Sequence, residues 1–494
     1  MFGLTDRPQR QVKTVGTATH TRVDLAAWRV EYPDEVVDIA KPRVLHQRIR
    51  SAKALRFVAE GTSIALGDPI AFDAWSGDVV ARAQCIGIFE RGTVFSGGYL
   101  ALIDTSTSNA TPPPPDTSQP SLVERLSETQ LTGLGGGGFP AARKVKAALD
   151  GGAKLLLINA VECEPDLGAD VWTLKHGLGD VGDGISALMK LGSFGRVVLT
   201  VCDAGKHLDL PKPTGIEVER AVVPNGYPGG EERQLLREVF DIFLEPLERA
   251  SERGVLVLNI GTVAALGAIA RGECPESRLV AVRGTAVGNP QLCRVRVGTP
   301  ISVVLDALGI QGKRVEVYSG GAVMHERVIS FDEPVCWSTT GLLVETKGMG
   351  FDTVAVQQPC IRCDACLPVC PEGLSPLKLW DIARRGREEP ALESHWLSCT
   401  QCRACDLVCP SHIPLAMAFA EVAGQILIRR EEQRNAERAK ARFERHERRA
   451  AKRAVERAQR VKRKARSVDT TRPPNPVGDI LAAARSKRAA RSSH

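Results

Sequence analysis

The chain has 494 residues, of which 43% are hydrophobic and 25% charged, a composition typical of a globular protein with three or four domains. No apolar run reaches the roughly 18 residues that span a membrane, and the opening residues lack the apolar segment of a secretory signal. We therefore expect a cytoplasmic protein that does not itself cross a membrane.

The first third of the chain predicts an extension, a small β domain and a linker. Residues 1–30 form the N-terminal extension, and residues 31–105 contain short apolar pieces broken by Gly, Asp and Pro, which is typical of β structure. The segment STSNATPPPPDTSQP at residues 106–120 predicts a stiff polar linker.

An α/β pattern follows. Residues 121–250 hold the buried-type strands AKLLLINAV and GRVVLTVCDA, with one helical stretch from Trp172 to Leu191 between them. A further strand, GVLVLNIGT, begins at Gly254, and the region 251–335 predicts a smaller α+β domain.

The segment GLGGGGFPAARK, residues 133–144, contains a run of glycines, which have no side chains, next to an aromatic residue and a lysine. A glycine-rich turn that leads into a helix aims backbone N–H groups at an anion, and the helix dipole adds favourable potential. The pattern indicates a phosphate cradle beside Phe139, with Lys144 one turn further along the helix. A flexible linker or a tight structural turn is the alternative.

Two matching cysteine runs lie in the region 336–428. CIRCDACLPVCP and CTQCRACDLVCP both read C-x2-C-x2-C-x3-C-P. In the two-cluster arrangement each run lends its last cysteine to the other 4Fe–4S cluster. The expected ligands are Cys360, Cys363, Cys366 and Cys409 for the first cluster, and Cys399, Cys402, Cys405 and Cys370 for the second. Structural zinc is the alternative, although zinc sites usually pair two C-x2-C hooks across a longer loop.

The tail, residues 429–494, is strongly basic. It carries 22 Lys and Arg against 8 Asp and Glu, while the whole chain has a net charge of +7. Strong helix formers without an apolar stripe predict a solvated helix. Its charge suits anionic lipid, an acidic partner or nucleic acid, and a tail that only aids solubility is the alternative.

Three further polar segments follow or flank predicted strands. NAVECEP, from Asn159 to Pro165, directly follows the strand KLLLI, and LNIGT ends another strand. Open parallel sheets bind ligands at the carboxyl ends of their strands. YPGGEERQL, from Tyr227 to Leu235, adds two glycines and two carboxylates.

Together with the glycine loop and the cysteine array, these segments resemble the flavin- and NADH-binding subunit of respiratory complex I. They resemble the C subunit of the Rnf electron-transport complex more closely, over roughly residues 30–428. The resemblance implies a multidomain α/β fold: a lipoyl-like barrel-sandwich β domain, a Rossmann-like FMN/NADH domain, a ubiquitin-like SLBB insert, a helical two-cluster ferredoxin domain and a basic helical tail. The β domain has no lysine to modify at its turn.

The resemblance also implies site residues. FMN phosphate and ring would be held by Gly133, Gly135, Gly136 and Lys144, with Phe139 as a stacking face for the nicotinamide nucleotide. The family motif NADESEP matches Asn159, Glu162, Glu164 and Pro165. Further cofactor-binding positions are Gly230, Glu231, Glu232, Asn259 and Thr262.

This sequence departs from complex I at three of these segments. Leu134 and Val161 replace an arginine and an aspartate, and Leu258 replaces an asparagine. The departures concern the details of nucleotide contact. Cys163 stands where serine is common, and we interpret it as a small packing residue.

The implied function is that of a peripheral electron-input component of a membrane-bound, ion-translocating NADH:ferredoxin oxidoreductase on the cytoplasmic side of the cell membrane. Electrons would pass between NAD(H), FMN, two 4Fe–4S clusters and partner subunits. Ferredoxin would be an indirect partner, and the basic tail would bind an anionic membrane surface. We expect no binding of nucleic acid. No side chain is expected to be catalytic, because cofactors carry the electrons. The alternatives are a soluble reductase of the cobalamin-reductase type and a non-catalytic nucleic-acid scaffold, which no groove-reading module supports.

Overall fold

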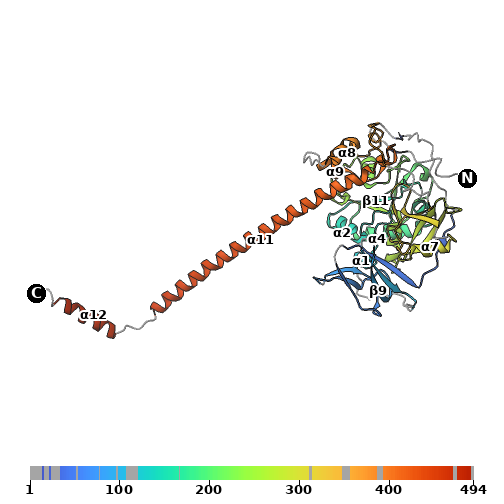
Figure 1. Cartoon of the computed structure of the whole chain (residues 1–494). Coiled ribbons are helices and arrows are strands. Elements are labelled where there is room, and N and C mark those ends of the chain that lie inside the picture. The colour runs from blue at the N-terminus through green and yellow to red at the C-terminus, as the bar shows by residue number, and fades with distance from the viewer. Residues whose placement is uncertain are drawn as a thin grey trace. The chain divides into compact units, whose positions relative to one another are not determined.

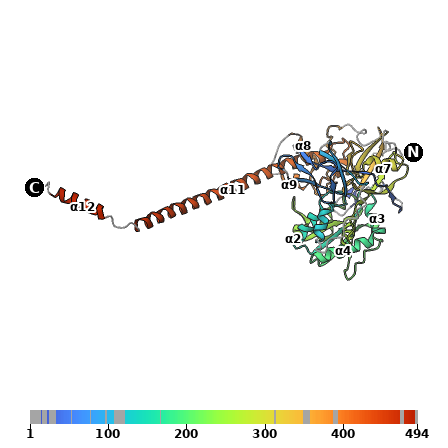
Figure 2. The same cartoon turned by 90° about the horizontal axis from the view of Figure 1, so that it is seen from below.

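The computed structural model describes residues 14–15, 22–23, 34–51, 54–76, 78–95, 98–106, 121–165, 167–310, 314–347, 357–385, 393–470 and 476–490. The chain divides into two units, Met1–Val422 and Ala423–His494. Residues 107–120 of the expected linker lie outside the described residues, and of the expected N-terminal extension only the two-stranded pair β1 (Thr14–Val15) and β2 (Arg22–Val23) is described. Figures 1 and 2 show the chain from two directions.

The N-terminal β domain consists of two small antiparallel sheets. One sheet has the order β4-β10-β9-β6, and the other has the order β5-β7-β8. Along β4 every second residue is buried, which is the pattern of a strand with one face on a core. The core contains Leu45, Ile70, Phe89 and Ile103. The strands are β4 (Val44–Ile49), β5 (Leu55–Phe57), β6 (Ser63–Ile64), β7 (Pro69–Asp73), β8 (Val79–Arg82), β9 (Gly87–Phe95) and β10 (Gly98–Asp104).

A four-stranded parallel sheet forms the centre of the next domain. Its order is β13-β12-β11-β14, and the strands are β11 (Leu155–Asn159), β12 (Arg196–Cys202), β13 (Glu219–Val223) and β14 (Val255–Asn259). The apolar runs of β11, β12 and β14 are almost fully buried because helices cover the sheet. The helices are α1 (Leu122–Glu128), α2 (Ala141–Asp150), α3 (Ala169–His176), α4 (Leu178–Leu191), α5 (Glu232–Phe240) and α6 (Ile260–Ala270), with short 3₁₀ turns at Asp203–Gly205 and Ala250–Arg253.

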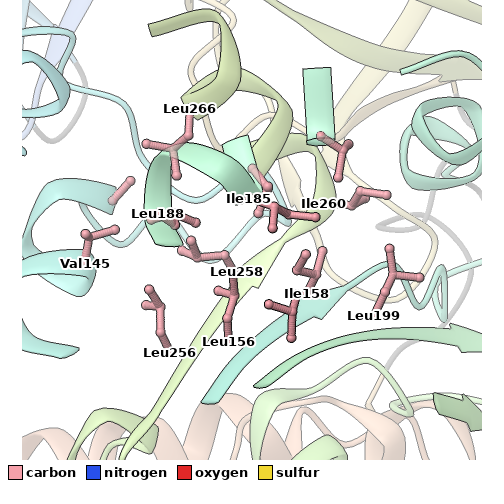
Figure 3. Packing of buried hydrophobic residues seen from close by; sticks show 14 of the residues in the cluster. Val145, Leu156, Ile158, Ile185, Leu188, Leu199, Leu256, Leu258, Ile260 and Leu266 are labelled. Carbon is pink, nitrogen blue, oxygen red and sulfur yellow. The ribbon is translucent and has the colours of Figure 1, made fainter. Parts of the chain in front are cut away.

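One face of this sheet packs on α4 and α6. Figure 3 shows Leu156 and Ile158 of β11 and Leu256 and Leu258 of β14 beneath side chains of these helices, including Ile185 and Leu266. The two helices approach closely at Gly184 and Gly267, where an added Cβ would lie 2.0 and 2.1 Å from backbone oxygens of the facing helix. The helical stretch expected from Trp172 to Leu191 is two helices, because the chain turns at Gly177.

A six-stranded mixed sheet forms the third domain, with the order β18-β17-β19-β15-β16-β3. Its strands are β3 (Val37–Asp38), β15 (Ser277–Arg283), β16 (Gln291–Arg296), β17 (Val315–Gly320), β18 (His325–Arg327) and β19 (Gly341–Thr346), with the helix α7 (Ile301–Ala307). The sheet extends past the boundary expected at residue 335. The buried run GLLVET of β19 pairs between β15 and β17, so it cannot belong to the cysteine-rich region.

Short helices surround the two cysteine runs. They are α8 (Pro376–Arg384), α9 (Glu393–Ser398), α10 (Ala404–Leu407) and the start of α11 (Leu415–Thr470). Pro376 at the first turn of α8 removes an N–H that would have had no partner.

The second unit is helical where it is described. It holds the rest of α11 and the separate helix α12 (Pro476–Ala489), and its residues from Glu431 to Lys464 are exposed. Across the described ranges, none of the helices combines the length and the apolar character needed to traverse a bilayer. The multidomain mixed α/β fold expected from the sequence is confirmed.

Candidate cofactor sites

The glycine segment forms a closed loop before α2. The Gly133 N–H donates to the Phe139 carbonyl at 2.9 Å, and Thr132 and Pro140 form a β-bridge. Gly136 and Gly138 have φ angles of +94° and +63°, which favour glycine. Pro140 precedes α2, and no side chain caps the first amides of that helix. The loop therefore leaves backbone N–H groups and a bare surface at a helix N-terminus.

Two buried polar side chains hold this loop. The Leu134 N–H donates to the Thr262 hydroxyl at 2.9 Å, and Thr262 is fully buried. Arg278 donates to the Leu134 carbonyl at 3.2 Å and to the Trp337 carbonyl. Burial lowers the pKa of Arg278 to about 10. The structure thus places Thr262 beneath the loop, and Arg278 is a loop-positioning residue that the sequence pattern did not indicate.

The loop lies between α6 and the segment that leads into β19. An added Cβ on Gly135 would contact the Asn259 side chain at 3.4 Å, and one on Gly136 would lie 3.2 Å from the Thr340 methyl group. A Cβ on Gly137 would meet nothing within 4 Å. The surface over Gly137 is therefore open while the loop on either side is packed.

Three polar groups form a chain where β11 and β14 end. The Asp170 N–H donates to Glu162 Oε2 at 2.9 Å, and Asn259 Nδ2 donates to both Asp170 carboxylate oxygens at 2.9 Å. Asn259 also caps α6 through its Oδ1 and the Gly261 N–H. Burial raises the pKa values of Glu162 and Asp170, so these two carboxyl groups and Asn259 form a poorly solvated acidic cluster. Asp170 was not expected from the sequence, because it lies outside every motif.

The side chains of Asn159 and Glu164 form hydrogen bonds that join the end of β11 to segments distant in the sequence. Asn159 Nδ2 donates to the Gly230 carbonyl at 2.8 Å, which joins β11 to the GGEE segment. Glu164 Oε1 accepts the Val323 and Met324 N–H groups at 2.9 and 2.8 Å. Burial raises the pKa of Glu164. Pro165 is buried beside them. The strand-end motif therefore fixes the GGEE segment and the Val323–Met324 turn against the end of β11.

The GGEE segment begins α5 and reaches the glycine loop's helix. Glu231 accepts the Arg233 and Gln234 N–H groups at 3.0 and 3.1 Å, so it is the N-cap of α5. Glu232 Oε2 lies 2.5 Å from Lys144 Nζ. The structure thus brings Lys144 of α2 and the carboxylates of α5 to one place, although 88 residues separate the pair.

Replacing Glu231 with glutamine should flatten the pH dependence of stability. Burial raises the pKa of Glu231 to about 7, above the roughly 4.3 of an unfolded chain. The folded chain therefore holds this proton more tightly, and the resulting stabilisation is complete below about pH 4.3 and lost as the pH rises through 7. Between about pH 5.5 and 8.5 the parent should lose roughly 2 kcal/mol that Glu231→Gln keeps. Urea denaturation at both pH values measures the free energy of unfolding of the two proteins. An equal loss of that free energy between the two pH values in parent and variant would contradict the prediction.

Phe139 stands at the edge of the loop. Its ring is 38% exposed, and the guanidinium groups of Arg143 and Arg249 lie 5.6 and 5.7 Å from the ring centroid. The ring is thus an accessible aromatic surface between two cations, a combination suited to a flat, anionic ligand.

The eight clustered cysteines line two separate hollows. Cys360, Cys363, Cys366 and Cys409 line one, and Cys370, Cys399, Cys402 and Cys405 line the other. The structure thus brings the last cysteine of each run to the other run's first three. Among the residues described, no set of three or more His, Cys, Asp or Glu side chains is arranged to hold a single metal ion.

The backbones of the two runs repeat each other. Arg362 and Gln401, each just before the second cysteine, have φ angles of 57° and 58°, and Asp364 and Arg403, just after it, have 57° and 59°. A left-handed residue with a side chain costs about 1 kcal/mol. Because the same unfavourable left-handed conformation occurs at matching positions, we infer that the two cysteine loops adopt it in order to surround the hollows that they line. No sequence signal marks these positions, since none is glycine.

The second hollow adjoins the parallel-sheet domain. The Tyr227 hydroxyl donates to the Cys402 carbonyl at 2.7 Å. Glu372, two residues after Cys370, accepts from Arg237 at 2.7 Å and Gln234 at 2.8 Å, and Arg233 lies 3.4 Å from it. Cys163 packs with Tyr227 and Cys402, as expected of a packing residue. Helix α5 therefore begins at Glu231 and Glu232 and contacts Pro371 and Glu372, which line the second hollow, through Arg233, Gln234 and Arg237.

Replacing Glu372 with alanine should destabilise the chain by about 3 kcal/mol. Its side chain is only 10% exposed, and its loss leaves two little-exposed arginines without their carboxylate. Glu219→Ala is the matched control, because its ion pair with Arg196 is exposed and should contribute less than about 1 kcal/mol. Urea denaturation of both variants compares them, and equal midpoints would show that the buried contact is not important.

Comparisons with known proteins bear on these sites. Residues 126–268 match the family described as the Nuo51 FMN-binding domain, and residues 357–413 match the 4Fe-4S dicluster domain. The C subunit of the ion-translocating oxidoreductase complex of Haemophilus influenzae (strain Rd) is 30% identical over 340 residues, which cover 66% of this chain and 40% of that protein. The protein of the same name from Cronobacter sakazakii is 32% identical over 342 residues, 66% of this chain and 43% of the other. The chain therefore spans less than half the length of these two relatives.

A solved structure, an NAD⁺-reducing [NiFe]-hydrogenase in the H2-reduced state, is 17% identical, covers 56% of this chain and 52% of its own, and has a TM-score of 0.38. That likeness is too low to support a functional statement. The sequence matches confirm the resemblance expected from the motifs. Over about two thirds of its length the chain is thus similar to the C subunit of ion-translocating oxidoreductase complexes, and it contains one region that matches the Nuo51 FMN-binding domain followed by one that matches the 4Fe-4S dicluster domain.

Proposed function

We propose that this protein is the electron-input component of a membrane-bound, ion-translocating NADH:ferredoxin oxidoreductase. It passes electrons between NAD(H), FMN and two 4Fe–4S clusters to partner subunits. The observation that carries the proposal is the direct contact between α5, which begins at the candidate nucleotide-binding carboxylates, and the second sulfur-lined hollow. A bound flavin exchanges electron pairs with nicotinamide and single electrons with iron–sulfur clusters, so it belongs between the two.

The glycine loop fits FMN. The open surface at Gly137, the positive φ angles of Gly136 and Gly138, and the uncapped start of α2 form a cradle that a Cβ would fill. The loop amides and Lys144 would hold the phosphate, and Asn259 stands where the loop meets the end of β14. Thr262 and Arg278 keep the loop in shape.

The carboxylates that follow β11 and those at the start of α5, together with Phe139, suit NAD(H). Carboxylates accept hydrogen bonds from ribose hydroxyls, and Glu162 and Glu164 follow β11 while Glu231 and Glu232 begin α5, which Asn159 joins to β11 through the Gly230 carbonyl. Arg143 and Arg249 would attract the pyrophosphate while the Phe139 ring offers a stacking face.

The hollows fit two 4Fe–4S clusters. Thiolates are the usual ligands of such clusters, and four cysteines line each hollow. The structural-zinc alternative is disfavoured because zinc sites usually pair two C-x2-C hooks, whereas each run here has a third and a fourth cysteine directly after the second. The finer domain assignments belong to the same proposal: a lipoyl-like β domain, a Rossmann-like FMN/NADH domain and an SLBB-type third domain.

We place the protein on the cytoplasmic face of the cell membrane, attached through partner subunits and the basic tail. Each Lys or Arg near an anionic leaflet contributes about 1 kcal/mol. The soluble cobalamin-reductase-type alternative has no use for such a tail. Co-purification with integral membrane proteins from solubilised membranes supports the complex, and quantitative recovery in the soluble fraction supports the alternative.

Removing residues 430–494 should weaken membrane attachment and leave NADH oxidation by an artificial acceptor unchanged. These residues carry a net charge of +13, whereas the rest of the chain is net negative, and they include none of the candidate cofactor ligands. The effect should fade as salt screens the charges. Sedimentation with vesicles containing anionic lipid, at low and high salt, measures it. Attachment as firm as that of the full chain at every salt level would contradict the role of the tail.

A further inference from the structure

Helix α5 contacts both candidate cofactor regions. At its start, Glu232 Oε2 lies 2.5 Å from Nζ of Lys144, on the helix that follows the glycine loop. Further along, Arg237 donates to the Glu372 carboxylate at 2.7 Å. Glu372 lines the second hollow, two residues after Cys370. Because α5 has only nine residues and packs at both ends, a displacement at one end is transmitted to the other.

The contact at the second hollow is little exposed and well connected. The Glu372 side chain is 10% exposed, and the Arg233 and Arg237 side chains that face it are 17% and 15% exposed. Gln234 Nε2 also donates to this carboxylate, at 2.8 Å. Separating a poorly solvated carboxylate from its cations is strongly unfavourable, so these groups move together. The segment after Cys370 therefore fixes the position of α5.

The turn before α5 makes a second connection. The hydroxyl of the buried Tyr227 donates to the Cys402 carbonyl at 2.7 Å. Three residues later, the Gly230 carbonyl accepts a hydrogen bond from Asn159 at the end of β11. An added Cβ on Gly230 would lie 2.8 Å from the Val161 carbonyl oxygen, so the turn packs closely on the segment that follows β11. The turn is thus fixed to the second cysteine run on one side and to the end of β11 on the other.

The first hollow is held by contacts within the cysteine-rich region. The Ser411 hydroxyl donates to the Pro359 carbonyl at 3.0 Å, and a guanidinium nitrogen of Arg362 lies 3.5 Å from an Asp381 carboxylate oxygen. All four of these residues belong to the cysteine-rich region itself. We therefore expect a cluster in the first hollow to have little influence on α5.

We propose that α5 and the turn before it couple the two cofactor sites. The cluster in the second hollow strengthens FMN binding at the glycine loop, and bound FMN strengthens retention of that cluster. The inference rests on the proposed function, because it needs both cofactors. Glu372 and Tyr227 are then positioning residues, which act on the flavin site through α5 and its preceding turn. Coupling between two binding sites is reciprocal, so each cofactor favours the other by the same factor.

The coupling acts through the order of the connecting segment. Cysteines that ligate a cluster hold the segment after Cys370 in one conformation. That segment orients α5, and α5 places Glu232 against Lys144, the cation assigned to the flavin phosphate. Without the cluster, FMN binding must itself order these groups, and the entropy lost in ordering them lowers its affinity.

The first experiment compares FMN affinity in full-length chains that lack one cluster. Cys402→Ser disrupts the second cluster, and its matched control Cys363→Ser disrupts the first. Fluorescence titration of each flavin-free chain with FMN gives Kd, and circular dichroism establishes that the fold is kept. We expect Kd to rise about tenfold in Cys402→Ser, within the usual range of coupling between sites, and less than about twofold in Cys363→Ser.

The second experiment cuts the connection and leaves all eight clustered cysteines in place. Glu372→Gln removes the charge that holds α5, and Tyr227→Phe removes the hydroxyl that donates to the Cys402 carbonyl. The matched controls are Glu219→Gln, in an exposed ion pair, and Tyr99→Phe, in the N-terminal β domain. Iron analysis establishes that each variant keeps both clusters.

The second experiment measures the effect of FMN on the second cluster. In the parent, added FMN should slow the removal of this cluster's iron by a chelator and change its EPR signal after reduction with dithionite. Both effects should be reduced at least about twofold in Glu372→Gln and Tyr227→Phe and unchanged in the two controls. A role in stability alone would not alter the response of one cluster to FMN.

Equal FMN affinity in Cys402→Ser and Cys363→Ser would overturn the coupling. If Cys402→Ser does not keep the fold, the second experiment decides, and an unchanged response to FMN in Glu372→Gln and Tyr227→Phe would overturn it. A parent that binds FMN and both clusters without mutual effect would refute the coupling alone. A parent that holds neither FMN nor clusters would instead refute the proposed function, so the two failures are distinguishable.

Discussion

Replacing Gly137 with valine should weaken FMN binding roughly 10- to 100-fold and leave the fold intact. A Cβ at this position meets no protein atom within 4 Å, so the side chain projects into the space assigned to the flavin. A steric clash there costs about 1–3 kcal/mol, and each 1.4 kcal/mol is a factor of ten in affinity. The free energy of unfolding should change by less than about 0.5 kcal/mol, as for other open surface positions.

Two further glycine variants separate binding from folding. Gly288→Val also meets nothing within 4 Å, but in a different domain, and should bind FMN as the parent does. Gly136→Val should lose both stability and flavin, because its φ of +94° and the nearby Thr340 methyl group oppose any side chain. Fluorescence titration of the flavin-free chain with FMN gives the affinities. Normal FMN affinity in Gly137→Val would place the flavin elsewhere.

Replacing Cys409 with serine should remove about four of about eight irons and damage the same cluster as Cys363→Ser. Both residues line the first hollow, although Cys409 belongs to the second cysteine run. Cys370→Ser should correspondingly reproduce the damage of Cys402→Ser, since both line the second hollow.

Cys274→Ser is the control for this series, because Cys274 lies outside both hollows and should leave iron unchanged. Iron and sulfide analysis and EPR of anaerobically purified proteins distinguish the variants. If Cys409→Ser instead damaged the cluster that Cys402→Ser damages, each run would hold its own cluster and the crossover would be wrong.

The sequence predicted the features that depend on local pattern. The apolar runs of β11, β12 and β14 indicated buried parallel strands, and the repeated cysteine spacing predicted that the last cysteine of each run lies with the first three of the other. The position of NAVECEP after a strand placed its polar groups at the sheet's carboxyl edge. In each case a few neighbouring residues carry the information.

Features that depend on contacts distant in sequence could not be predicted. Arg278 holds the carbonyl of Leu134, 144 residues earlier, and Glu372 joins α5 across more than 130 residues. Thr340 lies against Gly136 because β19 pairs between β15 and β17, a topology that no local pattern specifies. The boundary expected at residue 335 missed β19 for the same reason.

The central claim is that electrons from NADH reach iron–sulfur clusters through a flavin within this single chain. Anaerobic titration of the purified, cofactor-replete protein with NADH, followed by EPR together with iron, sulfide and FMN analysis, tests it most directly. We predict about eight iron, about eight sulfide and one FMN per chain, and reduced 4Fe–4S signals that grow with added NADH. Zinc without sulfide, or clusters that stay oxidised while NADH is in excess, would contradict the account.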